Sequence, residues 1–282
     1  MQKKVLITGA TGFVGSNVLE YLKKNTDWDI VSFDFRDRLV NIGKFDYILN
    51  LASESDVQRS IQSPVNFIHN NIDLILKVLE YARKYPPHVF LQFSTEEVYG
   101  ATNHKEWDVQ LPSNPYAASK SAQEMIAIAY WKTYRVPVVI TNSSNIVGKN
   151  QRKDKFIPKI IEQIKRGEEV TIYTSGGKVG KRYWNPVNNV ADAIKFILSL
   201  EPSMYPDQER LDRYDLPGGE QMDNLQMAQL VAELLNKPLK YKLIDAESIR
   251  PGYNEFYTKA EGKLIELGWK PKETLREGLL WI

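Results

Sequence analysis

Two neighbouring carboxylates, Glu96 and Glu97, close an apolar run, and Tyr116 and Lys120 follow them with a spacing of four residues. Residues four apart on a helix share one face, so the Lys120 ammonium would stabilise the Tyr116 phenolate and lower its pKa from about 10. Such a phenolate takes a proton from an alcohol while hydride leaves for a nicotinamide. Adjacent carboxyls push their pKa values apart, which suits one acid and one base. Without catalysis, Tyr116 would be an exposed tyrosine, Lys120 a solvated lysine, and the two glutamates part of a solvated loop edge.

A glycine-rich loop precedes these residues in the chain. Gly9, Gly12 and Gly15 follow the first expected strand and open a helix, with Thr11, Phe13 and Val14 between and beside them. Glycine permits a tight turn and close approach of the backbone to a pyrophosphate, and the helix N-terminus offers free N–H groups. Asp34, after the second strand, would hold the adenosine ribose and repel a 2′-phosphate, which favours NAD over NADP. Arg36 and Arg38 could instead bind that phosphate, which would favour NADP. The alternative to a dinucleotide site is an ordinary glycine turn.

The elements that position these residues alternate between short β-rich runs and longer helical patterns. We expect strands at 5–8, 30–34, 47–51, 89–94 and 138–142, and helices at 14–24, 65–84, 115–134, 156–166, 190–200, 225–235 and 260–267. Such alternation predicts an α/β fold with a Rossmann-type, doubly wound parallel sheet, whose ligands sit at the carboxyl ends of the strands. Consecutive strand residues point to opposite faces, so the two acids share a site only if the chain leaves the sheet at Thr95.

We divide the chain into a nucleotide-binding domain and a smaller α/β substrate-binding region. The first would comprise residues 1–147 plus about 184–201, and the second about 148–183 plus 202–282. Composition narrows the function further. With a formal charge of +2, no cysteine and only three histidines, the chain offers no argument for nucleic acid, membrane or metal binding. We expect a cytoplasmic enzyme without a resident metal ion.

Eight segments together carry a family resemblance that spans nearly the whole chain. They are TGATGFVG (8–15), LASESDVQRS (51–60), STEEVYG (94–100), NPYAASK (114–120), TNSSNIVG (141–148), FIPKII (156–161), GKRYW (180–184) and RPGYNEFY (250–257). In order and spacing they resemble the extended short-chain dehydrogenase/reductases. STEEVYG makes the chain look most like their nucleotide-sugar 4,6-dehydratases, the dTDP-glucose type.

The resemblance implies a mechanism with NAD as cofactor and a nucleoside-diphosphate hexose as substrate. Tyr116, with Lys120 and a Thr95 hydrogen bond, would oxidise the sugar at C4. Glu97 would remove the C5 proton, and Glu96 would protonate the departing C6 hydroxyl. Return of the hydride to C6 would then give a 4-keto-6-deoxy sugar nucleotide.

The resemblance also assigns binding residues. Leu51, Ala52, Ser53 and Asn70 would join the glycine loop, Asp34, Tyr116 and Lys120 around NAD. Around the sugar nucleotide it places Glu54, Ser55, Thr95, Asn145, Lys155, Tyr173, Arg182, Arg250 and Tyr253, although a single basic residue is as readily a solvated surface charge. The helices at 65–84 and 115–134 resemble the pair that forms a four-helix dimer interface, although core packing would explain their apolar faces equally well.

The chain departs from the family pattern in three places. Glu96 replaces the usual aspartate, which moves its carboxyl by about 1.5 Å, and a misplacement of about 1 Å can cost about 100-fold in rate. Asp56 stands where histidine is common, so the sugar selectivity would differ. Only fifteen residues, 35–49, separate Asp34 from Asn50. We therefore expect the usual crossover helix and extra edge strand to be missing there, with Asp37 a candidate to contact adenine.

Two other functions remain open. A nucleotide-sugar 4-epimerase, or another C4 oxidoreductase, would share the glycine loop and the Tyr116/Lys120 pair without needing Glu96 or Glu97. A non-catalytic dinucleotide sensor would keep the fold, but such proteins typically lose the Tyr/Lys pair.

Overall fold

A parallel six-stranded sheet forms the centre of the molecule in the computed structural model, which describes residues 2–33, 42–100, 104–200, 211–245 and 262–282. Its order is β10-β5-β4-β3-β1-β2, and every pairing is parallel. The strands are β1 (Lys4–Thr8), β2 (Asp29–Phe33), β3 (Tyr47–Asn50), β4 (Val89–Thr95), β5 (Val138–Ser143) and β10 (Asp212–Leu216). The central strands are buried on both faces, as is usual when helices cover both sides of a parallel sheet.

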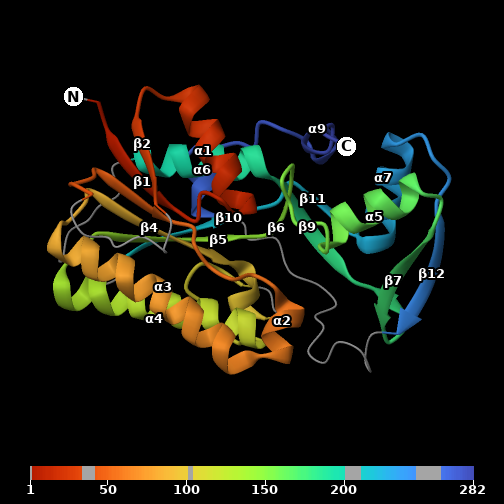
Figure 1. Cartoon of the computed structure of the whole chain (residues 1–282), viewed down its shortest axis with the longest axis horizontal. Coiled ribbons are helices and arrows are strands. Elements are labelled where there is room, and N and C mark those ends of the chain that lie inside the picture. Colours follow the sequence, from red (N-terminus) through yellow and green to blue (C-terminus); the bar gives the residue numbers. More distant parts are fainter. Residues whose placement is uncertain (1, 34–41, 101–103, 201–210, 246–261) are drawn as a thin grey trace.

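Helices pack on both faces of this sheet, so the predicted doubly wound α/β fold is confirmed (Figure 1). One face carries α1 (Phe13–Asn25) and α6 (Val187–Ser199), whose apolar residues share a core cluster with β1, β3, β4 and β5. The other face carries α3 (Pro64–Lys84) and α4 (Pro115–Tyr134), which lie along one another. The short helix α2 (Val57–Gln62) precedes α3.

Local sequence signals explain where α4, the helix carrying Tyr116 and Lys120, begins and ends. Pro115 occupies its first turn, and the Asn114 side chain accepts a hydrogen bond of 2.9 Å from the Ala117 backbone N–H. Proline is favoured at that position because its missing N–H would be unpaired there anyway, and asparagine is a strong N-cap. Arg135 ends the helix in the left-handed conformation, with φ 61°. The helix therefore has the bounds that its sequence predicts.

The connection from β2 to β3 is short, and its described part, residues 42–46, contains neither helix nor strand. Phe45 packs into the core on the α3 side, with its ring 6.4 Å from that of Tyr81. The Asp46 carboxylate accepts a 2.7 Å hydrogen bond from the Lys4 backbone, and the Gly43 carbonyl accepts one from the Tyr81 hydroxyl. In the described residues the sheet ends at β2, as the short spacing predicts. Asp34, Arg36, Asp37 and Arg38 lie outside the described residues.

A smaller region with two three-stranded sheets and its own core adjoins the central sheet (Figure 1). Its strands are β6 (Asn145–Val147), β7 (Glu169–Ser175), β8 (Lys178–Val179), β9 (Lys181–Pro186), β11 (Glu220–Asp223) and β12 (Lys240–Asp245). Its helices are α5 (Phe156–Lys165), α7 (Asn224–Leu234) and α9 (Leu275–Gly278). The short helix α8 (Lys263–Glu266) instead packs against β10, and its Leu264 belongs to the core of the central sheet. The sheet orders are β11-β9-β6 and β12-β7-β8.

One part of the expected division of the chain is wrong. Residues 202–282 were all assigned to the smaller region, but β10 returns to the central sheet and pairs with β5. Helix α6 packs against α1 on the central sheet. No helix among the described residues has both the length and the apolar character needed to cross a bilayer.

Candidate active site

The chain leaves the central sheet at Thr95, the condition under which Glu96 and Glu97 can share a site. A 3-10 helix, η1 (Glu96–Tyr99), follows β4 directly, so the strand alternation of side chains stops there. The Thr95 side chain caps this turn by accepting a hydrogen bond of 3.3 Å from the Glu97 backbone N–H. Both acids are thereby held at the carboxyl edge of the sheet.

Thr95, Glu97 and Tyr116 come together at this edge. The Thr95 and Tyr116 side chains are hydrogen-bonded, and the Glu97 charge acts on the Tyr116 hydroxyl. The Glu97 carboxylate accepts a 3.3 Å hydrogen bond from the side chain of Asn114, the N-cap of α4. The Tyr116 ring is fixed by an edge-on contact with Phe67, at 6.4 Å between centroids. The arrangement places a carboxylate beside the tyrosine that would handle the substrate hydroxyl.

The electrostatics of Tyr116 and Lys120 correct one expectation. Burial, and next the Glu97 charge, raise the pKa of Tyr116, while the hydrogen bond with Thr95 lowers it. Lys120 is buried, and its ammonium donates to the Phe93 carbonyl and to the Gln123 side chain, each at 2.7 Å. Burial lowers the pKa of Lys120 to about 8, with Glu124 acting in the opposite direction. The expected lowering of the tyrosine pKa by Lys120 is therefore not seen.

Glu96 points away from the surface, into a small pocket between the central sheet and the smaller region. Only 5% of its surface is exposed. The pocket is lined by Glu96, His104, Asn142, Ser144, Tyr183, Asp215, Leu216, Pro217 and Gly218. Burial, and next the Glu97 charge, raise the pKa of Glu96 well above its ordinary value, with Arg182 opposing and Asp215 adding to the shift. This rise favours the protonated form of Glu96, the form that a general acid needs.

Asp215 was not singled out from the sequence. It lies on β10 in register with Asn142 of β5, is 2% exposed, and neither of its carboxylate oxygens has a hydrogen-bond partner in the described structure. Burial, and next the charge of Glu106, raise the pKa of Asp215 well above its ordinary value. Two carboxyls with raised pKa values, Glu96 and Asp215, therefore share the pocket. An aspartate in a short polar run carries no local signal of such burial.

The glycine loop has the shape of a dinucleotide cradle. A Cβ at Gly9, whose φ is +71°, would lie 2.8 Å from the backbone N and Cα of Ala52. A Cβ at Gly15 would lie 2.1 Å from the Gly9 carbonyl oxygen. Gly12 caps α1 without any side chain, so the first N–H groups of the helix face the loop uncovered. Only glycine fits at Gly9 and Gly15, and the helix end at Gly12, which no side chain caps, suits a pyrophosphate. The residues present therefore fit a dinucleotide.

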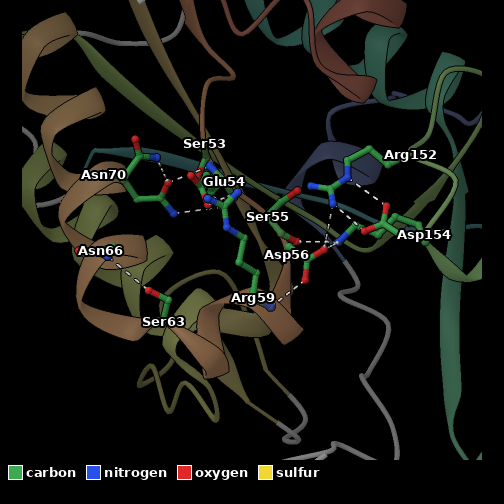
Figure 2. Close-up of polar contacts among 12 residues, drawn as sticks. Ser53, Glu54, Ser55, Asp56, Arg59, Ser63, Asn66, Asn70, Arg152 and Asp154 are labelled. Carbon is green, nitrogen blue, oxygen red and sulfur yellow. Dashed lines mark hydrogen bonds and ion pairs between the residues drawn. The ribbon is translucent and has the colours of Figure 1, made fainter.

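Asn71, the neighbour of Asn70, holds the segment after β3, which contains Ser53, Glu54 and Ser55 (the segment and Asn70 are labelled in Figure 2). Asn71 is fully buried, and its amide accepts from the Glu54 backbone N–H at 2.8 Å and donates to the Glu54 carbonyl at 3.1 Å. Asn70, the expected cofactor contact, donates to the Asn71 side chain at 3.5 Å. The Glu54 carboxylate forms an ion pair of 3.4 Å with Arg59. Asn71 thus shapes the segment that contains Ser53, Glu54 and Ser55.

Asp56 joins this segment to the loop before α5 (Figure 2). Its carboxylate lies 3.5 Å from the Lys155 ammonium and 3.6 Å from the Arg152 guanidinium, and it caps α2 by accepting from the Arg59 backbone at 2.9 Å. Burial opposes the charged form, but the Arg59 N–H and both cations outweigh it and lower the pKa of Asp56. Lys155 also donates to the Ser55 carbonyl at 3.1 Å. Two predicted substrate residues, Ser55 and Lys155, are therefore in contact.

The other predicted substrate residues are more scattered. Arg182 lies on β9, is 8% exposed, and its charge acts on Glu96. Asn145 lies on β6 in register with Trp184 of β9. Tyr173 lies on β7, in the separate sheet formed with β12 and β8 (Figure 1). Arg250 and Tyr253 fall outside the described residues.

Comparison with known proteins identifies the family. The model of the NAD dependent epimerase/dehydratase family matches residues 5–205. The chain belongs to this family. Its members use NAD, and the cradle built by Gly9, Gly12 and Gly15 fits that cofactor.

Curated relatives and solved structures match nearly the whole chain. The dTDP-glucose 4,6-dehydratase of Salmonella typhimurium is 29% identical, with 98% of this chain and 90% of that protein aligned. The enzyme of the same name from Xanthomonas campestris pv. campestris is 30% identical, with 97% and 90% aligned. The crystal structure of dTDP-glucose 4,6-dehydratase from Bacillus anthracis in complex with NAD has a TM-score of 0.79 at 26% identity, covering 99% and 94% of the chains. UDP-glucose 4-epimerase from Thermus thermophilus, at 24% identity and a TM-score of 0.83, shares the fold.

Proposed function

We propose that this protein is a nucleotide-sugar 4,6-dehydratase, which converts a nucleoside-diphosphate hexose to its 4-keto-6-deoxy form. One observation carries the proposal. Two adjacent carboxyls leave the end of β4 in different environments, Glu97 beside Tyr116 and Glu96 buried with its pKa raised. Elimination of water needs one ionised and one protonated carboxyl at neighbouring positions, and burial supplies that difference.

Each residue then has a defined task. Thr95 and Tyr116 would hold the C4 hydroxyl, and Tyr116 would take its proton. NAD, when bound, accepts the C4 hydride and later returns it to C6. The 4-ketone acidifies the C5 proton, which Glu97 would remove as general base. Glu96 would give its proton to the C6 oxygen as the C6–O bond breaks, so that water leaves, and C5 is finally reprotonated.

The substrate side of the proposal rests on the smaller region. Arg182, beside Glu96, and Lys155, beside Ser55, would contact the diphosphate, since both present hydrogen-bond donors with positive charge. Glu54 and Ser55 would line the sugar. Asn145, Tyr173, Arg250 and Tyr253 stay predictions as substrate contacts. The curated relatives named dTDP-glucose 4,6-dehydratase support a deoxythymidine diphosphate hexose as the first substrate to test.

We also propose a cytoplasmic homodimer that associates through α3 and α4. These two helices lie along one another, and Val65 of α3 and Met125 and Tyr134 of α4 are large exposed apolar side chains. Exposed apolar groups on a shared helical layer favour association with a second copy. Light scattering coupled to gel filtration tests this, and a mass of one chain at micromolar concentration would contradict it.

The direct test is incubation of the protein and NAD with a panel of nucleoside-diphosphate hexoses, read by mass spectrometry. The proposal predicts a product lighter by one water, with no net formation of NADH. An isobaric product would instead show a 4-epimerase, which needs Tyr116 and Lys120 but neither acid. Conversion of none of the sugars would favour a dinucleotide-binding protein without catalysis.

A further inference from the structure

A chain of buried hydrogen bonds runs through the central sheet from the glycine loop to Lys120. Thr8 ends β1 directly before Gly9, and its hydroxyl donates to the Asn50 side chain of β3 at 2.7 Å. Asn50 donates to Gln92 of β4 at 2.7 Å, and Gln92 donates to Gln123 of α4 at 3.2 Å. All four side chains have at most 1% of their surface exposed. Four polar side chains on four elements are thereby joined in the core.

All hydrogen bonds in this series run in the same donor-to-acceptor direction, which fixes the orientation of each side-chain amide in it. Asn50 and Gln92 each accept through the oxygen from one neighbour and donate through the nitrogen to the next. Gln123 follows the same rule, since its nitrogen donates to the Asn71 carbonyl at 2.7 Å. Reversing one amide would set two donors or two acceptors against each other, which is costly in a buried site. The Gln123 oxygen is therefore held facing Lys120.

Lys120 shares its acceptors with this chain. Its ammonium donates to the Gln123 oxygen and to the Phe93 carbonyl, both at 2.7 Å. Gln92 donates to the same two oxygens, at 3.2 and 3.1 Å. An ammonium with 4% of its surface exposed needs such acceptors, because burial without them disfavours the charged form. The position and charge of Lys120 thus depend on Gln123.

We propose that Gln123 is a positioning residue, which holds the Lys120 ammonium in place and charged and couples it through Gln92 and Asn50 to the strand that carries the glycine loop. The inference rests on the oxidation half of the proposed function, which a dehydratase and an epimerase would share. Gln123 would touch neither substrate nor cofactor and would act only through Lys120. Asn71, which accepts from Gln123 and also holds Glu54, would extend the same network to the sugar-side segment.

Two substitutions at one position separate this role from simple packing. Gln123→Met keeps the volume and removes the acceptor, so the pKa of Lys120 should fall and kcat should drop about 10- to 100-fold, the effect expected for one charge-assisted hydrogen bond. Gln123→Glu keeps an acceptor and adds a negative charge, so the pKa of Lys120 should rise, at some cost in stability because the donor to Asn71 is lost. A merely structural residue would give both variants the same pH profile as the wild type.

The primary readout needs neither substrate nor cofactor. In protein labelled with 13C-lysine, the Cε resonance of Lys120, assigned by comparison with Lys120→Met, reports its titration directly. We expect a wild-type pKa of about 8, a lower value in Gln123→Met and a higher value in Gln123→Glu. The alkaline limb of kcat should move in the same two directions, while KM for the sugar nucleotide changes little.

Asn185→Leu is the matched control, because Asn185 is a fully buried amide on β9 that donates to the Leu216 carbonyl. It takes no part in the series of hydrogen bonds from Thr8 to Lys120. The substitution should lower the melting temperature without moving the Lys120 titration. An unchanged titration in Gln123→Met, or a shift in the same direction in both Gln123 variants, would overturn the inference. If Gln123→Met does not fold, Gln123→Glu decides alone, since its Lys120 pKa must rise. A wild-type protein that converts no sugar nucleotide would refute the proposed function and leave the titration result standing.

Discussion

Replacing Arg213 with methionine should destabilise the protein strongly, because it breaks a fully buried ion pair between β10 and α4. Arg213 of β10 is 2% exposed, and its guanidinium lies 2.7 Å from the Glu124 carboxylate of α4, which is completely buried. The guanidinium also donates to the Tyr99 hydroxyl at 2.9 Å and lies 4.6 Å from the centre of the Trp107 ring. The pair therefore ties β10 to the helix that carries Tyr116 and Lys120.

The expected size follows from what Arg213→Met leaves behind. Glu124 would keep its hydrogen bonds from Asn142, at 2.7 Å, and Gln110, but its charge would be uncompensated. Removing one member of a buried pair costs about 3–5 kcal/mol, which corresponds to a fall of about 6–20 °C in Tm for a chain of this size. Urea denaturation followed by circular dichroism measures the free energy of unfolding, and the slope m should stay unchanged.

A double variant shows whether the uncompensated charge of Glu124 causes the loss of stability. The double variant Arg213→Met/Glu124→Gln removes the orphaned charge and should recover part of the loss. A single variant within about 1 kcal/mol of wild type, or a double variant no more stable than the single, would refute the reasoning.

Two further predictions concern the cradle and the pocket. Gly9→Ala would force a Cβ to 2.8 Å from the Ala52 backbone at a φ of +71°, so NAD affinity, measured by isothermal titration calorimetry, should be lost; affinity within threefold of wild type would contradict the assigned cradle. Asp215→Asn should stabilise the protein at pH 8, because burial raises the pKa of Asp215. The wild type loses stability as the pH rises from the unfolded pKa of about 3.9 toward the folded one, and an amide does not. Equal Tm values at pH 8 for wild type and Asp215→Asn would contradict the raised pKa of the buried carboxyl.

Much of the fold was predictable because its signals are local. The cap at Asn114 and Pro115 sets the start of α4, and Gly9 and Gly15 of the loop are required by a positive φ or by contacts of under 3 Å. The alternation of strands and helices then determines the parallel sheet, and residues 42–46, the described part of the short span before β3, contain no helix. Each of these inferences needs only neighbouring residues.

The remaining features depend on contacts distant in sequence. Strand β10 carries Arg213 and Asp215, charged residues that are unusual in a buried strand, and only pairing with Glu124 and the pocket explains them. Asn70 and Asn71 are neighbours on a helix, where about 100° separates consecutive side chains, so only the packed structure shows which one faces the core. The position of the Lys120 ammonium likewise depends on its contact with Gln123, a residue that belongs to no recognisable sequence motif.

We propose that Glu97 makes this protein a dehydratase, and the Glu97→Gln variant tests that role. Glutamine keeps the size of the side chain and removes the base beside Tyr116. We expect the variant to bind NAD as the wild type does and still to oxidise the sugar at C4, seen as NADH absorbance in a single turnover. Mass spectrometry should find no product lighter by one water. Water loss by Glu97→Gln at a rate near that of the wild type would contradict it.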